Sequence, residues 1–159
     1  PKAEIINKLV NEPASNQSVG EFNSNYQLIT LEEQLHQWIE KLREKTLFAL
    51  DTETTSLNYM SAKLVGISLA VNPGEAAYIP FAHDYIGAPD QIPMNVVLKL
   101  LKPLLEDPLL TKVGQNLKYD INVLAQHGVH LRGVLHDTML QSYIINSTAT
   151  KHDLSLIHI

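Results

Sequence analysis

The stretch that best indicates the fold is Thr46-Leu47-Phe48-Ala49-Leu50-Asp51-Thr52-Glu53-Thr54. Its apolar first half has the composition of a β-strand. Side chains two residues apart in a strand point to the same face, so Asp51 and Glu53 are expected together, about 7 Å apart along the chain. Two carboxylates this close repel each other unless a cation lies between them or one of them is protonated.

Two interpretations of this acid pair remain open. In the first, Asp51 and Glu53 form half of a metal site, because hard divalent cations such as Mg²⁺ prefer oxygen ligands and complete their shell with substrate phosphates. In the second, the strand simply ends in a polar turn, where both acids are solvated.

The composition is that of a single globular domain. The chain has 159 residues, of which 45% are hydrophobic and 18% are charged. Its formal net charge is −5, whereas proteins that hold duplex nucleic acid along their whole surface are usually basic. If the ligand is a nucleic acid, we expect local contact, with metal cations offsetting the carboxylates or a basic domain lying outside this chain.

The sequence predicts no membrane segment and no cysteine chemistry. Its longest apolar runs are far shorter than a membrane span, and its first residues lack the apolar core of a signal peptide. Without cysteine it has neither disulfides nor a thiolate metal site, which is compatible with the cytoplasm. We therefore expect a cytoplasmic protein.

The order of the expected elements indicates an α/β domain with a mixed sheet. Residues 1–25 are rich in Asn, Ser, Glu, Pro and Gly and are interpreted as a linker. The turn signal Asn72-Pro73-Gly74 predicts an antiparallel meander of three neighbouring strands. We expect strands at 26–29, 46–50, 63–71, 75–80 and 112–114, an extended piece at 134–135, and helices at 31–43, from 93 onward, at 117–126 and at 137–145.

Three local features concern the predicted helices. Thr30 and Glu33 have the spacing of a capping box at the start of the first helix. Trp38 falls on the apolar stripe of that helix and is expected in the core. Pro103 is expected to kink or break the helix that begins near Pro93.

A second polar motif, Gly114-Gln115-Asn116-Leu117-Lys118-Tyr119-Asp120, closes a strand and opens a helix. Gly114 would allow the backbone to approach closely. Asp120 is either a charge stabilised by the helix dipole or a third acid that joins Asp51 and Glu53. Phosphodiester hydrolysis by two metals held by carboxylates needs such a set, and no catalytic triad, P-loop or dinucleotide fingerprint competes with it.

These two motifs resemble those of the DEDD 3′–5′ exonucleases, in particular the proofreading domains of bacterial DNA polymerase I. The stretches 64–70, 77–80, 83–85 and 137–143 are also similar to that family, and the likeness covers about residues 26–153. The resemblance implies a ribonuclease-H-like mixed β-sheet flanked by helices, truncated at the C-terminus. It implies domain boundaries of 1–25 for the N-terminal extension, 26–153 for an incomplete exonuclease domain and 154–159 for an atypical tail.

The resemblance also implies roles for particular residues. Asp51, Glu53 and Asp120 would be the catalytic acids that hold two divalent metal ions, Mg²⁺ or alternatively Mn²⁺ or Zn²⁺, with Asp51 bridging both. The residues implied to contact a single-stranded DNA 3′ end are Leu57, Gln115, Asn116, Lys118, Tyr119 and Lys151. For Leu57 the alternative is a residue packed under a turn, and for Gln115 it is ordinary polarity between strand and helix. The family further implies a monomer in the bacterial cytoplasm, associated with the nucleoid, with a polymerase domain downstream.

The sequence departs from the family near its end. The family places a fourth acid in a later helix, four residues after a Tyr, and this chain stops at Ile159 without supplying it. Lys151 stands near the place of a family Arg and keeps the positive charge but not the bidentate fork. We therefore expect impaired activity in this chain.

Other interpretations of the sequence stay open. A ribonuclease-D-like enzyme that trims RNA shares the acids, and a non-catalytic domain that only supports a polymerase is an alternative of another class. The seven histidines show no metal-binding spacing and are expected at the surface or in loops.

Overall fold

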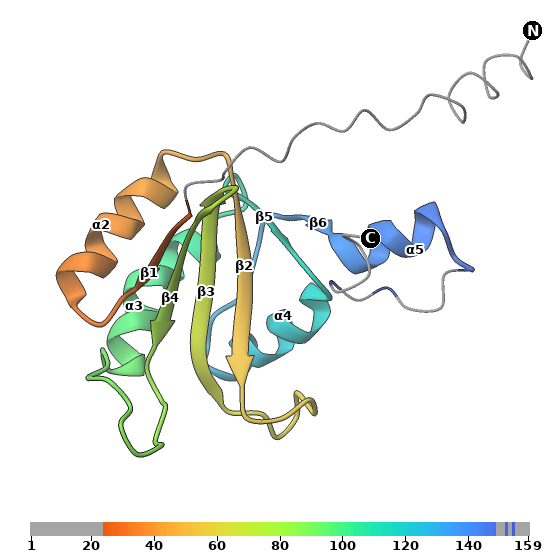
Figure 1. Cartoon of the computed structure of the whole chain (residues 1–159). Coiled ribbons are helices and arrows are strands. Elements are labelled where there is room, and N and C mark those ends of the chain that lie inside the picture. Colours follow the sequence, from red (N-terminus) through yellow and green to blue (C-terminus); the bar gives the residue numbers. More distant parts are fainter. Residues whose placement is uncertain (1–23, 149–151, 153, 155–159) are drawn as a thin grey trace, which may run out of the picture.

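A computed structural model describes residues 24–148, 152 and 154, and six strands there form one sheet in the order β1-β4-β3-β2-β5-β6 (Figure 1). The strands are β1 (Asn25–Leu28), β2 (Leu47–Thr54), β3 (Leu64–Asn72), β4 (Glu75–Pro80), β5 (Thr111–Gly114) and β6 (Val134–Asp137). The helices are α2 (Glu32–Arg43), α3 (Met94–Leu105), α4 (Leu117–Gln126) and α5 (Thr138–Ile145).

The pairing of the strands confirms the predicted mixed sheet. β2, β3 and β4 form the expected antiparallel meander, while β1 pairs parallel with β4, β5 with β2, and β6 with β5. Helix α3 connects β4 to β5 and so makes the crossover that a parallel strand requires. The predicted linker, residues 1–25, lies outside the described residues except for its last two positions.

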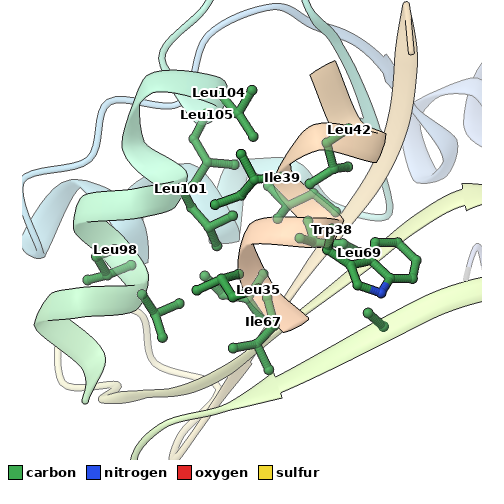
Figure 2. Close-up of a cluster of buried hydrophobic side chains, with 14 of the residues drawn as sticks. Leu35, Trp38, Ile39, Leu42, Ile67, Leu69, Leu98, Leu101, Leu104 and Leu105 are labelled. Atoms are coloured by element: carbon green, nitrogen blue, oxygen red, sulfur yellow. The ribbon is translucent and has the colours of Figure 1, made fainter. Parts of the chain in front are cut away.

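One face of the sheet carries the hydrophobic core. Helices α2 and α3 pack against this face, where Leu35 and Ile39 meet Leu101 and the β3 residues Ile67 and Leu69 (Figure 2). Each of these side chains is buried, so together they remove a large apolar area from water, at about 25 cal/mol per Å². The opposite face of β2 is more exposed, and Asp51 and Glu53 lie on that face, partly open to solvent.

Trp38 lies in the core, as its position on the helical stripe predicted. Its side chain is 1% exposed, and its indole N–H donates to Gln27 Oε1 at 2.8 Å. The indole N–H therefore has a hydrogen-bond partner although the ring is buried.

The predicted capping box of α2 is wrong in its residues. The helix begins at Glu32, after Leu31, and the side chain of Gln34 accepts from the backbone N–H groups of Thr30 (3.1 Å) and Leu31 (3.2 Å). The helix begins one residue later than the sequence suggested, which moves the cap by one residue. Gln34 then takes the position expected of Glu33.

Pro103 does not break α3, which continues to Leu105. The missing proline N–H would have reached Lys99, whose backbone lies at the exposed side of the helix. Since Pro103 sits in the last turn, few hydrogen bonds follow it, and the cost of its ring is small. Among the described helices, none has the length and apolar character needed to cross a membrane.

Candidate functional site

Strand β2 places Asp51 and Glu53 on the exposed face of the sheet. Its exposure alternates along the strand, with Leu50 and Thr52 buried and the two acids between and beyond them exposed. Across the meander Asp51 pairs with Ser68, and Glu53 pairs with Gly66, at the point where a bulge shifts the register. The expectation that both carboxylates share one face is therefore met by the strand's own alternation.

Asp120 reaches the same strand from helix α4. Its side chain is 2% exposed, and its Oδ1 accepts from the backbone N–H of Thr52 at 2.9 Å and from the Thr52 hydroxyl at 2.5 Å. Thr52 lies between Asp51 and Glu53 in the sequence, so the third acid is anchored at the residue that separates the first two. β5 ends short of this point, which leaves the Thr52 N–H free of sheet pairing on that side.

The turn between β5 and α4 aims Asp120 at β2. A Cβ on Gly114 would lie 2.5 Å from the Leu117 side chain and 2.6 Å from the Leu50 carbonyl oxygen, so only glycine permits this approach. Asn116 then adopts a left-handed conformation, with φ of 55°. These two residues bring the first turn of α4 directly against β2.

Asp137 fixes the same turn from the neighbouring strand. Its Oδ2 accepts from the backbone N–H of Leu117 at 2.8 Å, and its Oδ1 accepts from that of Asn116 at 3.1 Å. Oδ1 also accepts from the N–H groups of Met139 (3.0 Å) and Leu140 (3.2 Å). One carboxylate thus caps the N-termini of both α4 and α5, where the helix dipole favours negative charge.

The three acids form an electrostatically unfavourable group on their own. Burial raises the pKa of Asp51, and the charge of Glu53 raises it further. Burial raises the pKa of Asp120 to about 6, and the charge of Asp51 adds to the increase. The hydrogen bonds from Thr52 act in the opposite direction and lower the pKa. Within the described part of the chain, no Lys, Arg or His forms an ion pair with any of the three. Such a group is stabilised by a bound cation.

The donor set fits a hard divalent cation only in part. Asp51 and Glu53 offer exposed carboxylate oxygens, the ligands that Mg²⁺ prefers. In the region that the structure describes, however, no three His, Cys, Asp or Glu side chains are gathered closely enough to hold one ion. One oxygen of Asp120 is already engaged by Thr52. The acid pair could hold a metal with water and phosphate as further ligands, with Asp120 beside it rather than in the same shell.

The loop after β2 presents Leu57, one of the residues implied to contact DNA. Its side chain is 97% exposed, so the alternative of a residue packed under a turn is wrong. The hydroxyl of Tyr119 donates to the carbonyl oxygen of Ser56 and lies 2.5 Å from Thr54 Oγ1. Tyr119 on α4 therefore holds the loop that carries Leu57.

The remaining implied DNA contacts are dispersed. Gln115 is half-buried, donates to the His152 carbonyl oxygen at 2.6 Å and accepts from the Thr138 hydroxyl. Asn116 and Lys118 are exposed at the start of α4. Lys151 lies outside the described residues.

Two positioning residues were not foreseen from the sequence. Thr52 is a strand residue between two acids, and its only distinguishing signal is the hydroxyl on the buried face. Asp137 is recognisable as the cap of α5, but its bonds to α4 join residues 20 and 21 positions apart. A hollow of about 320 Å³ on the exposed face, lined in part by Asp51, Gln115 and Thr138, also came only from the structure.

Comparison with known proteins gives a consistent result. Residues 26–158 match the model of a family described as 3′–5′ exonuclease. The DNA polymerase I of Pseudomonas aeruginosa is 57% identical over 119 residues, which cover 74% of this chain and 13% of that protein. The chain therefore spans only about an eighth of the length of this relative.

Solved structures share the fold. The polymerase domain of Pol1 from M. smegmatis, in complex with a DNA primer-template and dNTP, has a TM-score of 0.64 at 20% identity, covering 85% of this chain and 23% of that one. Escherichia coli RNase D, described as an exoribonuclease involved in structured RNA processing, has a TM-score of 0.54 at 28% identity, covering 75% and 29%. Brucella melitensis NrnC with bound Mg²⁺ has a TM-score of 0.59 at 22% identity, covering 86% and 63%.

Proposed function

Since this chain belongs to the 3′–5′ exonuclease family, we propose that it is the proofreading domain of a DNA polymerase I and hydrolyses the 3′-terminal phosphodiester of single-stranded DNA. The observation that carries this proposal is the anchoring of Asp120 at Thr52, which brings an acid from α4 to the strand that presents Asp51 and Glu53. The polymerase domain would follow in the full protein, which would act as a monomer in the bacterial cytoplasm near the nucleoid.

In this proposal the three acids hold two divalent ions, of which Mg²⁺ is the first choice and Mn²⁺ or Zn²⁺ the alternatives. The solved structure of NrnC with bound Mg²⁺ supports that choice. Such ions would supply an activated water and offset the charge on the leaving oxygen. Asp51 and Glu53 provide the exposed oxygens, while Thr52 orients Asp120 and keeps one of its oxygens occupied.

In the same proposal, the loop after β2 positions the 3′ end of the DNA. Leu57 is exposed on the loop that follows β2, and there it would pack against the terminal base. Tyr119 holds that loop through Ser56 and Thr54, so its own contact with DNA would be made by the ring rather than by the hydroxyl. Gln115, Asn116, Lys118 and Lys151 complete the proposed DNA contacts.

The test is release of a labelled 3′-terminal nucleotide from a single-stranded oligonucleotide in Mg²⁺. Asp51→Asn should lower the rate at least about a hundredfold, because several kcal/mol of charge stabilisation is lost. The matched control is Glu33→Gln, an exposed acid on α2, which should cleave normally. A circular single strand should survive, since it has no 3′ end.

A second protein keeps this test decisive if the chain itself is inactive. The chain can be continued with the following residues of the Pseudomonas aeruginosa relative, which would supply the fourth acid of the family. If this longer protein releases no 3′ nucleotide in Mg²⁺, the nuclease proposal is wrong.

The identity of 28% with E. coli RNase D favours a second candidate, trimming of RNA. Competition between matched DNA and RNA strands decides between the two substrates. A third candidate is a non-catalytic domain that supports a polymerase, and the three acids Asp51, Glu53 and Asp120 at β2 argue against it. This supporting role predicts no Mn²⁺ binding that depends on Asp51.

A further inference from the structure

The space next to Glu53 on the exposed face is filled by Tyr78. Glu53 pairs with Gly66 on β3, and Ser68, two residues on, pairs with Tyr78 on β4. A Cβ on Gly66 would collide with the Tyr78 hydroxyl, so this hydroxyl occupies the position that a side chain at 66 would take. Directly paired positions in antiparallel strands have Cβ atoms about 4.5–5.5 Å apart, which places the hydroxyl beside the acid pair.

His83 fixes the Tyr78 hydroxyl and is itself fixed by Gln91. The hydroxyl lies 2.5 Å from His83 Nε2. The side chain of Gln91 accepts from the His83 backbone N–H and donates to the His83 carbonyl oxygen, each at 2.8 Å. Ring and backbone of His83 are therefore both held, and so is the loop of residues 81–92 at this position.

Tyr85 continues this arrangement outward. Its ring meets the His83 ring edge to face, with centroids 5.7 Å apart, and His83 meets Tyr78 in the same way at 5.9 Å. More than half of Tyr85, 59%, remains exposed. Burial raises the pKa of Tyr78, and the charge of Glu53 adds to this increase.

The sheet brings this aromatic group to the same end as Leu57. β2 and β4 both run antiparallel to β3, so the loops that follow them leave the same end of the sheet (Figure 1). Leu57 stands on the first of these loops and Tyr85 on the second. Asp51 and Glu53 lie in the second half of β2, near the same end of the sheet.

Building on the proposed nuclease function, we propose that Tyr85, held by His83 and Tyr78, is a stacking platform for an unpaired nucleobase of the substrate strand. A nucleobase presents an apolar face that stacks on aromatic rings with little dependence on sequence. A chain with a net charge of −5 and clustered acids attracts phosphates poorly, so an uncharged surface is a suitable source of affinity at this site. Rigid support lowers the entropy cost of binding there.

The adjacent Ile86 provides a matched control. Its side chain is fully exposed on the same loop, and as an aliphatic group it has no π-face. If exposed apolar area alone bound the strand, Ile86 would contribute as much as Tyr85. If stacking is responsible, only the aromatic ring matters.

The experiment measures equilibrium binding of a short fluorescent oligothymidylate to the whole chain in EDTA, where no hydrolysis occurs. We expect Tyr85→Ala to weaken binding about fivefold to a hundredfold, the range of one lost base stack. Tyr85→Phe should restore most of the affinity, and Ile86→Ala should bind like the wild type. Tyr85 lies in a loop and is exposed, so circular dichroism should show all three variants folded.

An abasic scan identifies the stacked base. Removing that one base should weaken wild-type binding as much as Tyr85→Ala does, and it should weaken Tyr85→Ala no further. Equal affinity of Tyr85→Ala and wild type, or equal losses at Tyr85 and Ile86, would overturn the platform and leave the nuclease proposal standing. If the wild-type chain binds no single strand at all, the nuclease proposal fails together with it.

Discussion

Asp120 Oδ1 accepts two hydrogen bonds from one residue, the backbone N–H of Thr52 at 2.9 Å and its hydroxyl at 2.5 Å, across 68 positions of sequence. Thr52 lies between Asp51 and Glu53, so the bond joins the two halves of the proposed site. Because Thr52 is buried and the flanking acids are exposed, its side chain points to the core face while theirs point to solvent. Because side chains alternate along β2, one short segment both anchors Asp120 and presents Asp51 and Glu53.

Replacing Thr52 with valine removes the hydroxyl and keeps the volume. The backbone N–H still binds Asp120, and only the hydroxyl bond is lost. We expect a decrease of about 1.5–3 kcal/mol in the free energy of unfolding, the value of one hydrogen bond to a charged group. Urea unfolding at neutral pH measures it. Thr111→Val on β5 is the control, since no side-chain hydrogen bond of Thr111 occurs within the described part of the chain; equal losses in both variants would deny Thr52 this role.

The raised pKa of Asp120 predicts a pH dependence of stability. Its pKa is about 6 in the folded chain against an ordinary value of 3.8, so the folded state binds the proton more tightly. The resulting stabilisation is complete below about pH 4 and is lost as the pH rises through about 6. Asp120→Asn lacks this titration, so its stability relative to wild type should increase from pH 4 to pH 7.5.

Thermal unfolding in EDTA at several pH values measures this difference. We expect it to reach about 1–3 kcal/mol, from the size of the pKa increase. A difference that does not change between pH 4 and pH 7.5 would contradict the buried position of the carboxylate.

Position 66 requires glycine because the Tyr78 hydroxyl occupies the space of a side chain there, and not because of the backbone conformation. Gly66→Ala would drive a methyl group into the Tyr78 hydroxyl, which His83 holds in place. We expect a loss of about 1–3 kcal/mol in unfolding free energy from this overpacking. In a Tyr78→Ala background the same change should cost little, so a double-mutant cycle by urea unfolding checks it; additive effects would refute the contact.

Asp137 should matter more for stability than its position on an edge strand suggests. It accepts from four backbone N–H groups in two helices, so Asp137→Ala should cost about 2–4 kcal/mol, more than the usual single cap. Guanidinium unfolding measures the loss. Asp90→Ala, an exposed acid in the loop before α3, should stay near wild type, and a similar loss there would exclude a capping origin.

The strand containing Asp51, the meander and the amphipathic helices were all predictable from the sequence, because alternation and helical spacing are local properties. Trp38 followed from the same stripe, and Gly114 from its place between a strand and a polar helix start. These features need only the neighbouring residues to be interpreted.

The rest depended on contacts between distant residues. Whether Asp120 was a helix-end charge or a partner of Asp51 could not be decided locally, because the answer depends on how α4 packs on β2. Gln34 replaced Glu33 in the cap of α2 because the helix begins at Glu32, one residue later than its local sequence indicated. The expected break at Pro103 was wrong because the cost of proline depends on how much helix follows it, and less than one turn does.

The nuclease proposal requires that Asp51, Glu53 and Asp120 together bind divalent cations, and Mn²⁺ titration of the chain tests this requirement most directly. Free Mn²⁺ can be followed by electron paramagnetic resonance at pH 7.5 for wild type, Asp51→Asn, Glu53→Gln and Asp120→Asn. We predict saturable binding that Asp51→Asn weakens by at least about tenfold and that Glu53→Gln and Asp120→Asn each weaken as well. Unchanged Mn²⁺ affinity and stoichiometry in Asp51→Asn would contradict the account.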